Sequence, residues 1–274
     1  MARVGWVTDL HLDWVERPKR REFYEVLHAA GLDFLLVGGD IGVAHSLPVF
    51  LSELQEAVHA RIYFVLGNHD YYGSSIAAVT DRVCRQAAAS TRLHWLASAG
   101  VIRLSESTAL VGHGSWADGR LGDFFRSQVL LNDYLLIEEL AIADEMRGRG
   151  AYEKGELFRR LNSLGDEAAQ FIRVVLAEAL KAYPKVVVLT HVPPFRESCW
   201  HEGRISTDDY LPHFACQAFG QALVDVLDQH PDRTLMVLCG HTHSSGFVQL
   251  RDNLAVWTGG AEYGRPILQQ VFEL

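Results

Sequence analysis

Six short apolar segments of this 274-residue chain end abruptly in glycine, aspartate, asparagine or histidine, and this repeated pattern constrains the fold most strongly. The segments run from Val4 to Asp9, Phe34 to Asp40, Ile62 to Asp70, Ala109 to His113, Val186 to His191 and Leu235 to His243. Apolar runs of four to six residues bounded by turn residues are typical of buried strands. The polar residues therefore stand where each strand is expected to end.

Helical patterns separate these segments. They run from Lys19 to Ala30, Pro48 to His59, Ile76 to Ala89 and Phe214 to Gln229. Alternating strands and helices predict an α/β sheet flanked by helices, in which ligands bind outside the carboxyl ends of the strands. We therefore expect all six polar strand ends to meet at one edge of the fold.

The remaining segments predict a second sheet and an insertion within a single domain spanning residues 1–274. Phe247–Leu250, Leu254–Trp257 and Ile267–Leu274 are expected to be antiparallel strands that close the fold. Between about residues 119 and 183 we expect a helical insertion that acts as a cap. Its two helices are predicted from Leu130 to Met146 and from Leu157 to Lys181, with a break at the glycines of residues 147–150.

Composition excludes several classes of protein. Apolar residues make up 49% of the chain, which is enough for a substantial core, and no apolar run approaches the roughly 20 residues that cross a bilayer. Twenty-five basic residues against 34 acidic ones give a net charge of −9, the wrong sign for holding extended nucleic acid by phosphate neutralisation. Four cysteines without CxxC spacing and the lack of a signal peptide predict reduced thiols in a cytoplasmic protein.

Metal-competent side chains follow five of the predicted strands. They form the groups Asp9-x-His11, Gly39-Asp40, Gly67-Asn68-His69-Asp70, Thr190-His191 and Gly240-His241-x-His243. Any one group alone is more often a turn, a cap or a buried histidine, but five in this order are hard to explain by chance. Oxygen and nitrogen ligands without thiolate suit manganese, iron or zinc, and seven ligands fit a pair of ions bridged by one carboxylate.

These five groups, in this order, resemble the signature of the calcineurin-like metallophosphoesterase superfamily. The resemblance implies a four-layer αββα sandwich, with two mixed sheets flanked by helices and a dinuclear metal centre at one edge. It also implies the ligands: Asp9, His11 and His243 for the first metal, Asn68, His191 and His241 for the second, and Asp40 as the bridge.

The same resemblance implies the catalytic residues. His69 matches the histidine that acts near the leaving group, and Asp70 is expected to be its orienting partner. One departure from the signature concerns the second group, which often continues as G-D-x-x-[DE]. Here Val43 stands at the place of that acid, which puts the hydrogen bonding around Asp40 in question, while His45 is expected to be a surface residue.

The implied activity is metal-dependent hydrolysis of phosphate esters by a hydroxide that two ions activate, with manganese or iron favoured and zinc as an alternative. The favoured substrates are small or nucleotide-type esters, cleaved by a phosphodiesterase or phosphatase. A DNA or RNA nuclease of the SbcD-like branch, acting on a short single strand, is the alternative. A non-catalytic scaffold is disfavoured because every ligand position is filled, and the oligomeric state stays open.

The predicted substrate-binding residues lie in the loops that follow the strands. An imidazole, an aromatic face and a guanidinium come together in the stretch after the fourth segment, and a further arginine follows His191. The predicted contacts are His113, Trp116, Arg120 and Arg196. Aromatic faces beside arginines could stack a nucleobase and neutralise a phosphate. The alternative is that Trp116 packs beneath the insertion.

Overall fold

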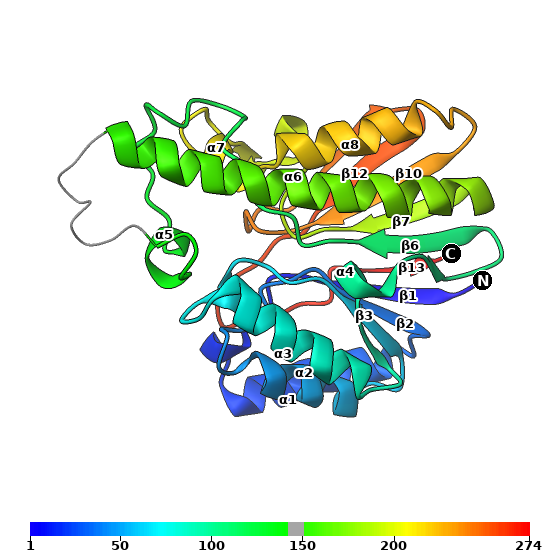
Figure 1. Cartoon of the computed structure of the whole chain (residues 1–274). Coiled ribbons are helices and arrows are strands. Elements are labelled where there is room, and N and C mark those ends of the chain that lie inside the picture. The colour runs from blue at the N-terminus through cyan, green and yellow to red at the C-terminus, as the bar shows by residue number, and fades with distance from the viewer. Residues whose placement is uncertain (142–150) are drawn as a thin grey trace.

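Two β-sheets pack face to face between two layers of helices in the computed structural model, which describes residues 1–141 and 151–274 (Figure 1). The first sheet has the order β13-β1-β2-β3-β4, with strands at Gln270–Glu273, Arg3–Val7, Phe34–Val37, Arg61–Phe64 and Leu93–Trp95. Strands β1 to β4 are parallel, and β13 is antiparallel to β1. The carboxyl ends of β1, β2 and β3 therefore meet at one edge.

The second sheet has the order β11-β12-β10-β7-β6-β5. Its strands span Gly246–Arg251, Leu254–Thr258, Thr234–Cys239, Lys185–Leu189, Thr108–Gly112 and Ile102–Arg103. The four central strands are parallel, whereas β11 and β5 are antiparallel edge strands. A small hairpin of β8 (Trp200–His201) and β9 (Arg204–Ile205) stands apart from both sheets.

Helices cover the outer face of each sheet (Figure 1). The first sheet carries α1 (Arg17–Ala29), α2 (Leu47–Ala57) and α3 (Ile76–Ala88), with the short α4 (Leu96–Ala99) after β4. The second carries α6 (Ala151–Ala182) and α8 (Gln217–Leu227). Short turns of helix are η1 (Leu12–Trp14), η2 (His69–Tyr71), α5 (Asp133–Leu136), η4 (Arg196–Ser198) and α7 (Leu211–Phe214).

Local sequence explains where two of the outer helices begin. Helix α1 has a proline in its first turn, where the missing N–H costs no hydrogen bond. At α3 the hydroxyl of Ser75 accepts a hydrogen bond from the Ala78 N–H, and the Glu139 carboxylate accepts from the Ile76 N–H at 2.8 Å. These caps satisfy amide groups that the helix itself leaves free.

Three apolar layers hold the sandwich together. Leu35 and Ile62 of the first sheet pack against α1 to α3, and Val186 and Val188 of the second pack against α6 and α8. The layer between the sheets contains buried side chains from both, including Leu36, Leu110 and Leu238. The predicted four-layer αββα sandwich is therefore confirmed.

Several predicted elements differ from the structure. Of the helix predicted from Leu130 to Met146, only Asp133–Leu136 is helical within the described residues, because Asp133 and Tyr134 turn inward to hydrogen-bond with Tyr72 and His213. Residues 142–146 and the predicted break at 147–150 lie outside the described residues. At the C-terminus, β11 and β12 are antiparallel as predicted, but β12 is also parallel to β10, and β13 pairs antiparallel with β1 of the first sheet instead of joining the second.

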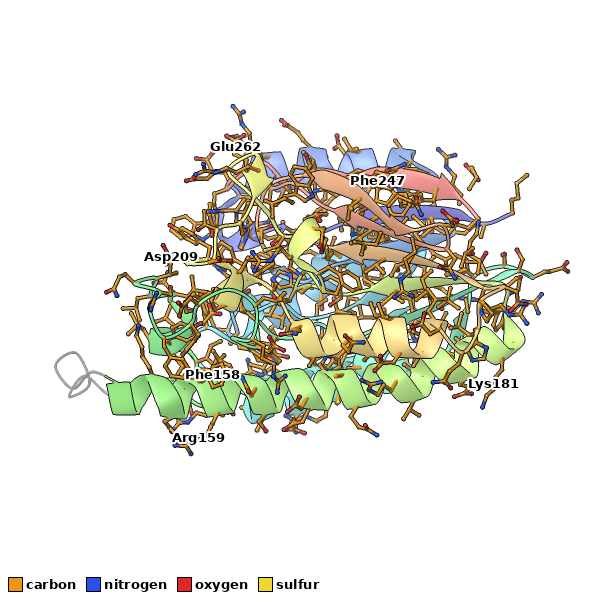
Figure 2. The ribbon with its side chains drawn as sticks, turned by 90° about the horizontal axis from the view of Figure 1, so that it is seen from above. Phe158, Arg159, Lys181, Asp209, Phe247 and Glu262 are labelled. Carbon is orange, nitrogen blue, oxygen red and sulfur yellow. The ribbon has the colours of Figure 1, made fainter. Side chains whose placement is uncertain are left out.

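The second insertion helix is present and extends beyond its predicted ends. Helix α6 packs along α8 and against β6 and β7, so it supplies the outer layer of the second sheet. Figure 2 shows Phe158 on the side of α6 that faces the body of the molecule and Arg159 on the opposite side. Among the described residues no helix combines the length and the apolar character that a membrane crossing needs.

Replacing Leu176 by alanine in α6 tests this packing. The Leu176 side chain has no exposed surface, so Leu176→Ala should lower the free energy of unfolding by about 2–5 kcal/mol. Val174 on the same helix is 59% exposed, and Val174→Ala should change it by less than about 0.5 kcal/mol. Urea unfolding in the presence of a chelator measures both values, and equal effects would contradict the assignment of α6 to the core.

Candidate metal centre

The seven predicted ligands meet at the carboxyl ends of strands from both sheets. Asp9 and His11 follow β1, Asp40 follows β2, Asn68 comes after β3, His191 follows β7, and His241 and His243 follow β10. Ligand atoms of Asp9, His11, Asp40 and His243 all lie within 4.8 Å of one another. Within this group the Nε2 atoms of His11 and His243 are 3.0 Å apart.

A second group of ligand atoms surrounds His191. Its Nε2 lies 3.0 Å from Asn68 Oδ1 and 3.2 Å from His241 Nδ1. Two protein carbonyls orient the rings, because the Nδ1–H of His191 donates to Gly38 O at 2.9 Å and the Nε2–H of His241 donates to His213 O at 3.3 Å. The unprotonated nitrogen of each ring is thereby turned toward the centre, as metal-binding histidines require.

Asp40 stands between the two groups. Its Oδ2 is 3.7 Å from His11 Nε2, and its Oδ1 is 3.5 Å from His191 Nε2. One carboxylate oxygen thus faces each group of ligands. This is the geometry expected of a carboxylate that bridges two ions.

The backbone at these positions adopts a conformation that side chains usually avoid. Seven described non-glycine residues have positive φ, and five of them are predicted ligands. The five are Asp9 (51°), His11 (42°), Asp40 (51°), His241 (73°) and His243 (59°). Such conformations cost free energy and persist where the surrounding structure imposes them, often at functional sites. Here they turn the chain sharply after each strand, so that the ligands point into one space.

Two glycines give the ligands room. A Cβ atom on Gly67 would lie 2.2 Å from Asp40 Oδ1 and 2.7 Å from His191 Cε1, and one on Gly240 would lie 2.0 Å from Asp9 Oδ2. Contacts this short are not possible without movement of the ligands. The glycines of the third and fifth motifs are therefore required by the close approach of the backbone to the ligands.

The electrostatics of the site fit cations held by nitrogen and oxygen atoms. Burial raises the pKa of Asp40 to about 7 and the pKa of Asp9 to about 6, and it lowers the pKa of His11 well below its usual range. Neutral imidazoles and buried carboxylates are the protonation states and ligand types that manganese, iron and zinc take. The side chains present therefore suit a metal centre.

His69 lies at the border of this centre. Its ring stacks on Tyr72 with centroids 4.2 Å apart, and its Nε2 is 3.9 Å from Asp40 Oδ2. Its backbone N–H donates to Asp40 Oδ1 at 2.9 Å. The side chain keeps 19% of its surface exposed, so the imidazole can reach a molecule bound in the neighbouring cavity.

Contrary to the prediction, Asp70 does not contact the His69 ring. Its buried carboxylate instead accepts hydrogen bonds from the N–H groups of Gly67, Ile41 and Gly42 at 2.8 to 3.0 Å. Both oxygens are engaged by backbone, which corrects its expected role as the partner of His69. Asp70 connects the loop of the third motif to the loop that follows Asp40.

Another carboxylate makes hydrogen bonds in the loop where the second motif lacks its acid. The carboxylate of Asp13 accepts from the Val43 N–H at 2.7 Å and from the Ser46 hydroxyl at 2.6 Å. Asp13 comes two residues after His11, so it connects the first ligand loop to the loop after Asp40. His45 is exposed, in agreement with its prediction as a surface residue.

A cavity of about 410 Å³ opens at the metal centre. Its lining includes His69 and four predicted ligands, together with Tyr72, Leu131, Asn132, Asp133, His201, Glu202, Phe214, Thr242, Ser244 and Tyr263. Asp133 is the residue that sequence reasoning missed most clearly. It accepts from Asn68 Nδ2 at 2.8 Å and from the Tyr72 hydroxyl at 2.6 Å, which turns the Asn68 oxygen toward His191. No motif surrounds Asp133 in the sequence.

The four predicted substrate contacts are not among the residues that line this cavity. His113 and Trp116 line a separate cavity of about 530 Å³, where the Trp116 ring packs 5.2 Å from Tyr71. The Trp116 ring therefore packs against a neighbouring aromatic ring, which is the alternative interpretation of this residue. The two arginines form ion pairs with neighbouring acids: Arg120 with Asp118 at 3.0 Å and Asp166 at 2.8 Å, and Arg196 with Asp208 at 2.7 Å.

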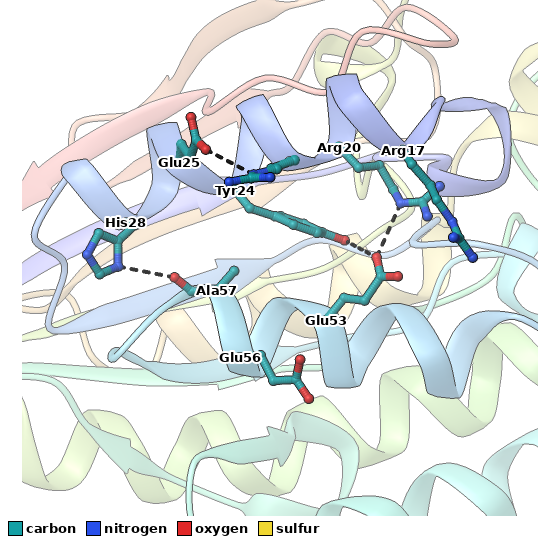
Figure 3. A pocket seen from close by; sticks show the side chains of 9 residues that line it. Arg17, Arg20, Tyr24, Glu25, His28, Glu53, Glu56 and Ala57 are labelled. Carbon is teal, nitrogen blue, oxygen red and sulfur yellow. Dashed lines mark hydrogen bonds and ion pairs between the residues drawn. The ribbon is translucent and has the colours of Figure 1, made fainter.

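A further cavity, of about 540 Å³, lies between α1 and α2, and none of the seven ligands is among its lining residues (Figure 3). Its polar groups satisfy one another, since Tyr24 and Arg20 both donate to the Glu53 carboxylate. Arg20 also donates to Val15 O at 2.7 Å. This network stabilises the turn that follows His11.

Comparison with known proteins agrees with this geometry. The family model of the calcineurin-like phosphoesterases matches residues 2–245. No curated protein matches the sequence significantly.

Three solved structures share the fold, and at these low identities the likeness concerns the fold alone. The phosphopantetheinyl hydrolase of Mycobacterium tuberculosis is 14% identical with a TM-score of 0.62, over 96% of this chain and 90% of its own. A dimetal phosphatase from Danio rerio is 12% identical with a TM-score of 0.57, over 94% and 87%. The protein TT1561 of Thermus thermophilus is 14% identical with a TM-score of 0.50, over 94% and 89%.

Substituting Gly67 tests whether the close approach of the backbone sets the metal site. In Gly67→Ala the new methyl group must displace Asp40 or His191, so the purified protein should bind less manganese, as measured by elemental analysis and calorimetry. Gly155 is the matched control, since it lies in α6 with open space around it. Gly155→Ala should leave metal binding intact and stabilise the helix by about 1 kcal/mol. Full manganese binding by Gly67→Ala would contradict the account.

Proposed function

The chain belongs to the calcineurin-like phosphoesterase family, and on that premise we propose that it hydrolyses small or nucleotide-type phosphate esters at a dinuclear metal centre. The proposal rests on Asp40, whose two carboxylate oxygens face two separate groups of ligands. Asp9, His11 and His243 would hold one ion, and Asn68, His191 and His241 would hold the other. Manganese, iron or both are favoured for this donor set, with zinc as an alternative.

When bound, two such ions supply positive charge that activates water and stabilises the oxygens of the phosphoryl group. The protein's own contribution is to place the remaining groups. His69 borders the cavity beside Asp40, and its stacking on Tyr72 restricts the ring to one orientation. From there it can hold or transfer the proton that the departing alkoxide needs.

The size of the cavity and the net charge of the protein favour small substrates over long nucleic acids. A volume of about 410 Å³ is in the usual range for small-molecule sites, and the net charge of −9 disfavours a long polyanion. Both phosphodiesterase and phosphatase activity are compatible with the described walls. A short single strand at the centre is the nuclease alternative, and a substrate panel separates these activities.

The panel uses metal-free protein with manganese added back. Bis-p-nitrophenyl phosphate, p-nitrophenyl phosphate, nucleotides and single-stranded DNA or RNA are compared under the same conditions. We expect hydrolysis of at least one small ester, loss of that hydrolysis with a chelator and recovery with manganese. Cleavage of polynucleotide alone would contradict the small-substrate proposal, and inactivity of the metal-loaded protein on every substrate would contradict the enzymatic one.

His69→Ala tests the proton-transfer role. Hydrolysis of an ester with a poor leaving group should slow by about 100-fold or more, whereas the metal content should be retained because His69 is not a ligand in this scheme. The exposed His45 is the matched control, and His45→Ala should keep the rate of the wild-type protein. An unchanged rate in His69→Ala on that ester would exclude the role.

A further inference from the structure

Two aromatic side chains beside the metal centre are largely exposed. Trp14 has 66% of its surface exposed and Tyr263 has 48%, and their rings are 5.7 Å apart in an edge-to-face arrangement. Adjacent exposed aromatic groups are not explained by core packing. Tyr263 lines the cavity at the metal centre and Trp14 lies next to Tyr263 outside that lining, and exposed apolar surface that borders a cavity is a common sign of ligand binding.

Tyr263 connects this pair to the metal ligands. Its ring centroid lies 4.5 Å from that of His11 and 5.2 Å from that of His243, and Tyr263 lines the metal cavity. The three rings of His11, Tyr263 and Trp14 therefore lead from the ligands out to the surface. A planar group attached to a phosphate at the metal centre would meet the face or edge of Tyr263.

The loop that carries Tyr263 is fixed at both ends. The Ala261 N–H donates to His243 O at 3.1 Å, and the Gln269 side chain hydrogen-bonds with both backbone polar groups of Gly260, at 2.6 and 3.2 Å. The backbone that carries the ring is thus held in place before a ligand arrives. A preorganised aromatic surface binds with a smaller entropic cost than a mobile one.

Among the described residues, the lining of the cavity contains neither lysine nor arginine. An anionic group in the organic part of an ester would therefore form no ion pair with such a side chain. Phe214 adds a further aromatic ring to the lining, 5.4 Å from the ring of His241. Recognition by stacking is therefore favoured over recognition of an anionic group by charge on these walls.

We propose that Tyr263 and Trp14 form an aromatic subsite that binds a flat aromatic or heteroaromatic group carried by the phosphate ester. This inference rests on the proposed function and narrows it to esters of aryl alcohols or nucleosides. Neither residue belongs to the five motifs, since Trp14 follows the first and Tyr263 comes after the last. The subsite would therefore determine specificity without taking part in metal binding.

Two non-hydrolysable probes test the subsite by equilibrium binding. Phenylphosphonate and methylphosphonate carry the same phosphonate group, and calorimetry on the manganese-loaded protein compares their dissociation constants. We expect phenylphosphonate to bind about tenfold more tightly, in line with the strength of aromatic stacking. In Tyr263→Ala and in Trp14→Ala this ratio should fall toward one, while Tyr263→Phe should preserve it.

Phe247 provides the matched control. It is an aromatic residue on β11 with 50% of its surface exposed, and it does not line the metal cavity (Figure 2). Phe247→Ala should keep the wild-type ratio. A ratio near one in the wild-type protein, or an unchanged ratio in both alanine variants, would overturn the proposal. Trp14→Ala keeps the test decisive if Tyr263→Ala disturbs the neighbouring ligands.

Turnover separates this inference from the proposed function. Phenyl p-nitrophenyl phosphate and methyl p-nitrophenyl phosphate share one leaving group, so their kcat/KM values differ through the second ester group. Hydrolysis of both with equal kcat/KM would leave the proposed function standing and remove the subsite. If neither diester is hydrolysed, phosphodiesterase activity is excluded and the monoester arm of the panel decides the proposed function, whereas the phosphonate ratio still decides the subsite.

Discussion

The carboxylate of Asp40 is the group on which the site depends. It is buried, and its two oxygens face His11 from the first sheet and His191 from the second. The core between the sheets sets how the two strand edges meet, with Leu36 on one side and Leu238 on the other. This packing brings ligands from both sheets to Asp40. A buried carboxylate among neutral imidazoles is unfavourable without a cation. The fold therefore builds a site whose charge is balanced when metal binds.

Hydrogen bonds hold this unfavourable arrangement in place. The turns after β1, β2 and β10 have left-handed backbone at their ligands, which costs free energy at each position. Asp70 and Asp13 offset part of that cost, since their carboxylates accept from the backbone of the loop after Asp40. Asp9 acts similarly by accepting from the His241 N–H at 2.9 Å, which connects the two sheets directly.

Much of the architecture could be predicted because its signals are local. Apolar runs that end in metal-competent residues predicted the strands and the seven candidate ligands. The C-terminal segments predicted a second sheet, and the resemblance to the phosphoesterase signature implied the four-layer sandwich. The insertion was harder, since Asp133 and Tyr134 leave a helical pattern to make contacts with residues distant in sequence. Long-range packing also decides that Trp116 lies against Tyr71, whereas Tyr263, which no motif marks, lies beside His11.

The most direct test of the dinuclear centre is the anomalous scattering of crystals grown with manganese. We expect two peaks about 3.5–4 Å apart on either side of the Asp40 carboxylate. One peak should be bound by Asp9, His11 and His243, and the other by Asn68, His191 and His241. A single peak, or peaks that none of these side chains contacts, would contradict a dinuclear centre.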